Sequence, residues 1–137
     1  MGEVRAQVKL INAADETLAR RGMMPPDQIH VYETNALIDT GAVSTVIPTD
    51  VVRTLGLDSI HQRVVEYADG RQETVDVVGP LAVIIRGRRT FEEALVLGDE
   101  VLIGQTVLEK LDLHVDCANQ QLIPNPAHPD QTVNKVK

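Results

Sequence analysis

The chain has 137 residues, of which 43% are apolar and 24% charged, as in a soluble globular protein and not in a disordered one. Its formal net charge of −7 repels phosphate backbones, and only three aromatic residues are present to stack on bases, so we expect no nucleic-acid partner. The single cysteine, Cys117, excludes an intrachain disulfide and fits a reducing compartment.

No segment predicts a targeting peptide or a membrane span. The first ten residues alternate between polar and apolar types and contain no continuous apolar stretch. The longest clear apolar run, residues 81–85, is far shorter than the roughly 20 residues that a spanning helix needs. We therefore expect a soluble, cytoplasmic protein with no membrane partner.

The first part of the chain predicts strands, because its hydrophobic period is two. Residues 4–10 alternate as in a half-buried strand. Residues 12–28 are irregular and charged and end in two prolines, which predicts a long loop. Further strands are expected around residues 29–33 and 36–38, followed by a turn at residues 39–41.

Two short helices are predicted farther along. Pro48 and Thr49 favour the start of a helix over Asp50–Leu55, and Gly56 is suited to end it. For the second helix, Thr106 and Glu109 have the spacing of a capping box.

Three hairpins are also expected. The dipeptide Asp69-Gly70 is a strong signal for a two-residue turn, residues 86–89 predict a second tip, and residues 118–119 a third. The strand spacing favours a closed barrel, so we predict one all-β domain over residues 1–137. Its core spans about residues 30–124, with an N-terminal strand and loop over residues 1–29 and an extended tail over residues 125–137.

The segment that carries chemistry is Ala36–Ala42, which reads Ala-Leu-Ile-Asp-Thr-Gly-Ala. An apolar strand here delivers the Asp39 carboxylate onto a tight turn, and the glycine lets the backbone fold back closely behind it. Taken alone, the tripeptide fits equally well an aspartate that only accepts backbone hydrogen bonds in a turn.

This segment resembles the active-site motif of the retropepsin-like aspartic proteases. Downstream, Val101–Gly104 matches the second element of that family, in which apolar residues and a glycine precede a helix. The hairpin at residues 67–70 stands where the family has its flap. The Leu-Gly-Asp-Glu run at residues 97–100 is similar to bacterial and archaeal single-domain members. The resemblance covers about residues 30–124.

The resemblance implies a closed acid-protease barrel, one lobe per chain, in which Ile103 and Gly104 thread beside the Asp39 loop. It also implies two carboxylates that share one proton, one acting as a base toward water while the other polarises the scissile carbonyl. Because the chain has one Asp-Thr-Gly, we expect a homodimeric endopeptidase with Asp39 from each subunit, a peptide or protein substrate and no cofactor.

The neighbouring residues acquire roles by the same resemblance. Thr40 would form hydrogen bonds across the dimer axis, Gly41 would permit the turn, and Ala42 would line the cleft. A flap would close over the extended peptide and exclude water. The residues of this flap are Tyr67, Ala68, Asp69 and Gly70.

Two positions depart from the family pattern. Retropepsins usually have an acidic residue after Asp-Thr-Gly-Ala and an arginine after the later apolar-Gly element, whereas this chain has Val43 and Gln105. Their joint absence removes an ion pair without leaving a lone buried charge. The alternatives are a catalytically silent dimer that binds peptides or acts as a scaffold, and a small-ligand barrel in which Asp39 is structural.

No other cluster predicts chemistry. His114 and Asp116 alternate on one strand, but no second cluster completes a metal shell, so we expect no metal site. We interpret Cys117 as a small buried hydrophobic residue, residues 86–89 as a solvated tip, and residues 92–93 as solvated edge charges.

Overall fold

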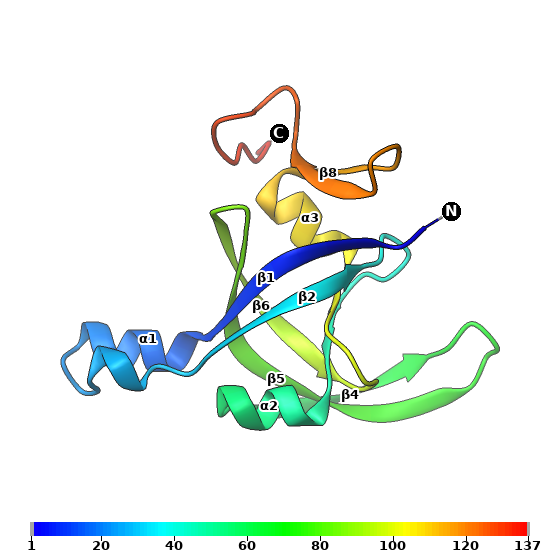
Figure 1. Ribbon diagram of the computed structural model, residues 1–137. Helices are drawn as coiled ribbons and strands as arrows, with labels where there is room; N and C mark the ends of the chain where they lie inside the picture. Colours follow the sequence, from blue (N-terminus) through cyan, green and yellow to red (C-terminus); the bar gives the residue numbers. More distant parts are fainter. Residues whose placement is uncertain (1, 137) are drawn as a thin grey trace.

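The computed structural model describes residues 2–136, and strands make up 46% of it, which confirms the all-β class. Six strands close into a barrel, and a two-stranded sheet lies beside it (Figure 1). The strands are β1 (Val4–Asn12), β2 (Val31–Ile38), β3 (Thr45–Ile47), β4 (Asp58–Glu66), β5 (Gln72–Ile85), β6 (Arg88–Val96), β7 (Leu102–Ile103), β8 (Leu113–Asp116) and β9 (Gln121–Pro124). The helices are α1 (Ala13–Arg20), α2 (Thr49–Leu55) and α3 (Gln105–Leu111), with a 3-10 turn η1 (Pro26–Gln28).

The long strand β5 closes the barrel. The large sheet has the order β1-β2-β7-β3-β6-β5-β4, and β1 also pairs with β5 through residues 9–12 and 81–84. The first half of β5 instead pairs with β4, and its register against β6 shifts between Val78 and Leu81. The β4–β5 hairpin therefore projects from the barrel as an addition to the closed ring (Figure 1).

The barrel interior is apolar and holds the strands that lead to the site. On β1, Val8 and Leu10 are buried and alternate with more exposed residues, which confirms the predicted period of two. Ile103 of β7 is fully buried in the same cluster, together with Leu55 of α2 and Leu111 of α3. This core fixes the positions of β7 and α3, which contact the Asp39 loop.

Helix α1 replaces the first part of the loop predicted over residues 12–28, so the fold has three α-helices and not two. Asn12 caps the helix by accepting a hydrogen bond from the Asp15 amide (3.1 Å). Acidic Asp15 and Glu16 in the first turn and Arg20 in the last complement the helix dipole. The two prolines come after the helix, where they do not disturb it.

The hairpin tips also differ from the prediction. At the first tip the Gly70 amide donates to Tyr67 O (2.9 Å) and the Tyr67 amide to Arg71 O (2.8 Å), so the loop has three residues and not two. At the second, Arg86 and Gly87 alone form the turn, both with positive φ, and residues 88–89 already belong to β6. The third hairpin, β8–β9, forms as predicted.

The helix ends show which capping predictions succeed. Helix α2 ends at Leu55 with Gly56 in the left-handed conformation (φ +59°), as predicted. The capping box predicted for α3 is wrong, because Gly104 and not Thr106 is the N-cap, and Thr106 lies inside the first turn of a helix that starts at Gln105. The tail is not simply extended, since residues 126–131 form turns and bends that fold back toward α3 (Figure 1).

Candidate active site

The Asp39 carboxylate lies on a loop that leaves the end of β2. The Asp39 amide donates to Ile103 O (2.9 Å), which ties the start of the loop to β7. Asp39 Oδ1 accepts the Gly41 amide (2.9 Å), and Asp39 O accepts the Ala42 amide (3.1 Å). Within the described part of the chain, Gly41 is the only hydrogen-bond donor to this half-buried carboxylate, so its other oxygen is open to a partner from outside.

Gly41 is needed for a close approach. A Cβ atom at this position would lie 3.2 Å from Asp39 Oδ1, which is tighter than ordinary van der Waals contact. A side chain would therefore press on the carboxylate and disturb the hydrogen bond from the residue's own amide.

Gly104 allows the second element to pass directly beside the loop. Strand β7 runs parallel to β2, with Ile103 opposite Ile38, so Gly104 follows at the level of Asp39. A Cβ atom at Gly104 would lie 2.7 Å from the carbonyl oxygens of Val43 and Ser44. Backbone packs on backbone here, and no side chain fits between them.

The first amides of α3 hold the other end of the loop. The Gln105 amide donates to Ala42 O (2.7 Å) and the Thr106 amide to Val43 O (3.3 Å). Because the first amides of a helix have no partner inside it, the loop carbonyls satisfy groups that are otherwise unpaired. The loop and α3 thus fix one another without the ion pair whose usual positions are occupied by Val43 and Gln105.

The side chains at these two positions do not face each other in an equivalent contact. Val43 is 71% exposed. The Gln105 amide nitrogen Nε2 donates weakly to Glu109 Oε1 (3.4 Å), within its own helix. The loop therefore presents an exposed apolar side chain four residues after Asp39.

The predicted flap is the tip of the β4–β5 hairpin, and the structure leaves it apart from the Asp39 loop. Arg71, which the sequence reasoning missed, organises this tip: its guanidinium lies 4.9 Å from the Tyr67 ring, and its Nε donates to Asp69 Oδ2 (2.7 Å). The backbone amide of Arg71, with help from this guanidinium, lowers the pKa of Asp69. Among the described residues, no hydrogen bond joins residues 67–70 to the loop.

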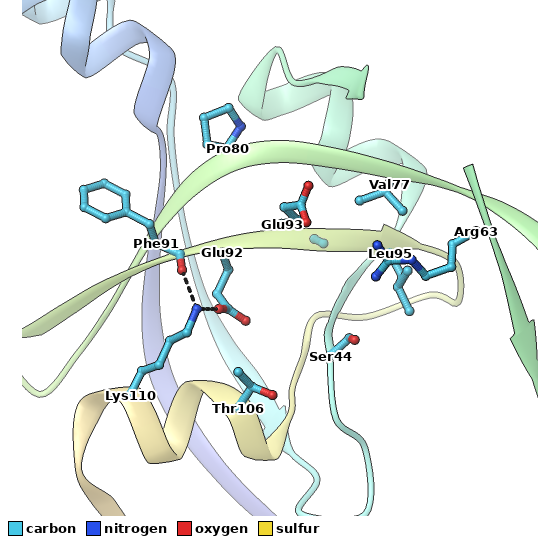
Figure 2. Close-up of a pocket in the computed structure, with 11 residues that line it drawn as sticks. Ser44, Arg63, Val77, Pro80, Phe91, Glu92, Glu93, Leu95, Thr106 and Lys110 are labelled. Carbon is cyan, nitrogen blue, oxygen red and sulfur yellow. Dashed lines mark hydrogen bonds and ion pairs between the residues drawn. The ribbon is translucent and has the colours of Figure 1, made fainter. Parts of the chain in front are cut away.

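A pocket of about 340 Å³ opens over β6, between the β4–β5 hairpin, the end of the loop and α3 (Figure 2). Ser44 and Thr106 lie on the side of the loop and α3, and Arg63 of β4 on the side of the hairpin. Val77 and Leu95 add apolar surface. The pocket adjoins the end of the Asp39 loop at Ser44, and its lining mixes polar and apolar side chains.

Glu92 is a charged residue that the sequence reasoning placed wrongly at the solvated edge of the sheet. Its side chain is only 7% exposed and forms an ion pair with Lys110, while Thr45 Oγ1 donates to it (3.3 Å). Strand alternation explains this, because Glu92 shares the inner side of β6 with buried Ala94, whereas Glu93 points outward and is 51% exposed. A buried carboxylate needs such partners, and here they tie β6 to α3 and β3.

The remaining candidates are spread over the surface. Cys117 is exposed at the β8–β9 turn, so its interpretation as a buried residue is wrong. Between residues 2 and 136, no three His, Cys, Asp or Glu side chains gather as metal ligands would. In the same part of the chain, none of the helices combines the length and the apolar character that crossing a bilayer requires.

The closed six-stranded barrel, with an Asp-Thr-Gly loop packed against an apolar-Gly segment and a short helix, defines an acid-protease-like barrel. A sequence model of the family described as aspartyl protease matches residues 28–107, more than half of the chain. The chain therefore belongs to this aspartyl protease family, which is part of the retropepsin-like clan. A search among curated proteins finds no match to the sequence.

Proposed function

We propose that the protein is an aspartic endopeptidase whose active site forms in a homodimer from the Asp39 carboxylates of two subunits. The observation that carries this proposal is the Asp39 loop itself. Its carboxylate is half-buried and held through one oxygen by the Gly41 amide, while Gly104 packs against the backbone of residues 42–44 in the same loop. One chain supplies one such loop, and the chemistry needs two carboxylates close together.

In the proposed dimer, the two Asp39 side chains share one proton. The ionised carboxylate takes a proton from a water molecule, whose oxygen attacks the carbonyl carbon of the scissile peptide bond. The protonated carboxyl gives its proton to the carbonyl oxygen, which yields a neutral tetrahedral diol. The carboxyl that took the water proton then gives it to the amide nitrogen, while the other carboxylate takes a proton from a diol hydroxyl. The C–N bond breaks, an acid and an amine leave, and the dyad again holds one proton.

The residues around Asp39 support this reaction in defined ways. Thr40 is exposed at the turn, which suits a contact across the dimer axis. The β4–β5 hairpin projects from the barrel with residues 67–70 at its tip, and in the proposed enzyme it would cover a bound peptide. The pocket beside Ser44 would accept one side chain of the substrate. The exposed thiol of Cys117 fits a reducing cytoplasmic location.

Cleavage of a mixed peptide library at about pH 4 to 7 tests the proposal. We expect the wild type to cut and Asp39→Asn to lose at least about a thousandfold in rate, because the neutral amide cannot act as the base. Asp58→Asn, which changes an exposed aspartate at the start of β4, is the matched control and should cut like the wild type.

The alternative outcomes are distinct. If wild type and Asp39→Asn both bind peptides as dimers and neither cuts, the silent peptide-binding dimer replaces the enzyme. If both cut equally, the activity belongs to another site and Asp39 has no catalytic role.

A further inference from the structure

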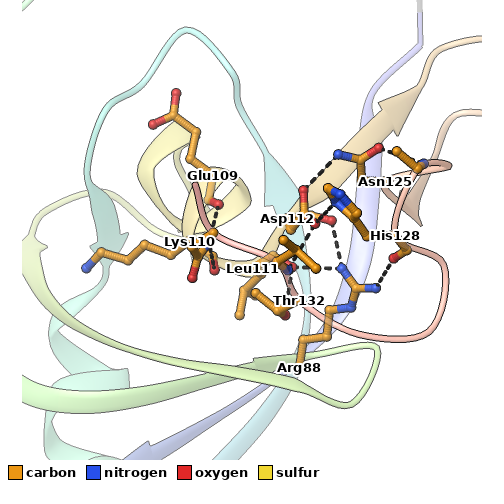
Figure 3. A network of polar contacts seen from close by, with 11 residues as sticks. Arg88, Glu109, Lys110, Leu111, Asp112, Asn125, His128 and Thr132 are labelled. Carbon is orange, nitrogen blue, oxygen red and sulfur yellow. Dashed lines mark hydrogen bonds and ion pairs between the residues drawn. The ribbon is translucent and has the colours of Figure 1, made fainter. Parts of the chain in front are cut away.

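The C-terminal tail binds the end of α3 that lies opposite the Asp39 loop (Figure 3). Thr132 Oγ1 donates to Leu111 O (3.1 Å), and Asn134 Nδ2 donates to Lys110 O (3.1 Å). The last carbonyls of a helix have no donor inside it. The tail therefore supplies, from more than 20 residues farther along the chain, the hydrogen bonds that α3 cannot make itself.

Arg88 joins the tail and the helix to the barrel. This residue of β6 is only 8% exposed, which contradicts its interpretation as part of a solvated tip. Its Nη1 donates to Leu111 O (3.0 Å) and Asp112 O (2.8 Å), and its Nη2 donates to His128 O (2.7 Å). A buried guanidinium needs such acceptors, so its placement depends on both the helix end and the tail.

Asp112 makes the matching contact from the helix side. The residue ends α3 in the left-handed conformation (φ +59°). Its carboxylate accepts hydrogen bonds from His128 Nδ1 (2.6 Å), Asn125 Nδ2 (2.8 Å) and the Val133 amide (3.2 Å). One side chain thus binds three separate points of the tail.

Helix α3 connects the tail contacts at its C-terminal end with the candidate active site. It has seven residues and is therefore about 10 Å long, and its two ends are held by different segments. The first amides bind the carbonyls of Ala42 and Val43, and the last carbonyls bind Arg88 and the tail. Because so short a helix behaves as a rigid element, a change in the contacts at one end of α3 moves the other end.

We propose that the tail, residues 125–134, is a clamp that positions the Asp39 loop through α3, with Arg88 and Asp112 as positioning residues. Neither residue touches the reacting atoms. The structural part of this proposal is independent of the enzyme activity, and only its effect on turnover rests on the proposed function. Loss of the clamp, by substitution or by a cut in the tail, loosens the carbonyls that hold the loop in place.

Hydrogen exchange of the full-length protein tests the clamp. Asp112→Asn keeps the shape and tolerates the positive φ, but it places an amide where three donors converge. We expect the amides of Ala42, Gln105 and Thr106 to exchange at least about tenfold faster, while those of β1 and β5 keep their rates. Asp116→Asn is the matched control, because its carboxylate accepts from Asn119 (2.9 Å) and makes no tail contact.

Thr132→Val provides a second, milder variant that removes one hydrogen bond to α3 without adding charge or volume. It should accelerate exchange at the same three amides by a smaller factor. Faster exchange confined to residues 109–133, with the loop and the first turn of α3 unchanged, would overturn the proposal.

Kinetics separate the clamp from the proposed function. If the protein cuts peptides, Asp112→Asn should lower kcat about five- to tenfold with KM nearly constant, because the substrate contacts stay in place. If the wild type cuts no peptide, the proposed endopeptidase activity is refuted, and the hydrogen-exchange result still tests the clamp by itself. An active wild type with unchanged exchange and kcat in both variants refutes the clamp alone.

Discussion

Two glycines at the site are required because a side chain would collide with neighbouring atoms, and not because the backbone has an unusual φ angle. Neither Gly41 nor Gly104 has a positive φ, yet each lies where a methyl group would meet polar atoms of the loop. Such positions are recognised in a sequence only through a motif, because the crowding atoms of Val43 and Ser44 lie some 60 residues before Gly104. The motif predicts this contact, and the structure gives its steric reason.

Gly104→Ala tests that reason. The added methyl group would lie 2.7 Å from two carbonyl oxygens, so the loop must move away from β7. We expect urea unfolding to show a loss of about 1–3 kcal/mol, with faster exchange of the Asp39 amide. Gly70→Ala, which has nothing within 4 Å, should cost only the strain of its positive φ and leave the Asp39 amide protected. Wild-type stability of Gly104→Ala would contradict the crowding argument.

Asp112 predicts an acid-dependent loss of stability. The hydrogen bond from the Asn125 side chain, followed by the one from His128, lowers the pKa of Asp112 below 3.8. A carboxylate with a lower pKa in the folded state stabilises the protein above its unfolded pKa, and this contribution is lost as the pH falls through the folded pKa. Between about pH 5 and 3, we expect the free energy of unfolding to decrease less steeply in Asp112→Asn than in the wild type. If the free energy of unfolding falls with pH equally steeply in both proteins, the Asp112 carboxylate contributes nothing to stability.

Among the helices and strands, local patterns predict most elements, and the failures have both local and distant causes. The alternation in β1 and the glycine after α2 are local signals, and both predictions are confirmed. The sequence predicts a loop where α1 forms, because the two prolines at residues 25–26 exclude a helix interior, although Asn12 is a good N-cap for the residues before them. The start of α3 depends on carbonyls of Ala42 and Val43, which no neighbouring residue reveals.

The roles of Arg88 and Glu92 had one usable signal. Both lie on alternate positions of β6 that share a side with buried Ala94, so the strand period alone points them inward. What the period cannot supply is their partners, which come from α3, β3 and the tail. Charged residues on the inner side of a strand are therefore candidates for contacts between elements.

Asn12 joins two elements and gives a prediction at this scale. Its oxygen caps α1, while its Nδ2 donates to Leu55 O (2.9 Å) and Gly56 O (3.2 Å) at the end of α2. Asn12→Ala should cost about 2–4 kcal/mol in urea unfolding, more than an ordinary cap. Asn12→Asp should not restore the lost stability, although aspartate is an equally good cap, because its carboxylate would face the carbonyl oxygens of Leu55 and Gly56. An Asn12→Asp variant as stable as the wild type would contradict this account. Asn35→Ala, at an exposed position of β2, is the control and should keep the stability of the wild type.

For the whole molecule, the proposed active site requires association. Specific activity should fall on dilution, because a monomer has a single Asp39. We expect the rate per chain and the dimer fraction from sedimentation to fall together, with a rate maximum on the acid side of neutral. A constant rate in solutions that contain only monomer would refute the shared site, and a rate still rising above about pH 8 would refute the shared proton.

The way the barrel closes has a consequence for how the protein can change over evolution. The ring is completed by β1 against residues 81–84 of β5, and β4 takes no part in that closure. Substitutions in β4 and at the hairpin tip thus leave the hydrogen bonds of the ring intact. The surface that would select substrates can vary while the barrel that holds Asp39 keeps its stability, so we expect tip variants to differ in preference more than in melting temperature.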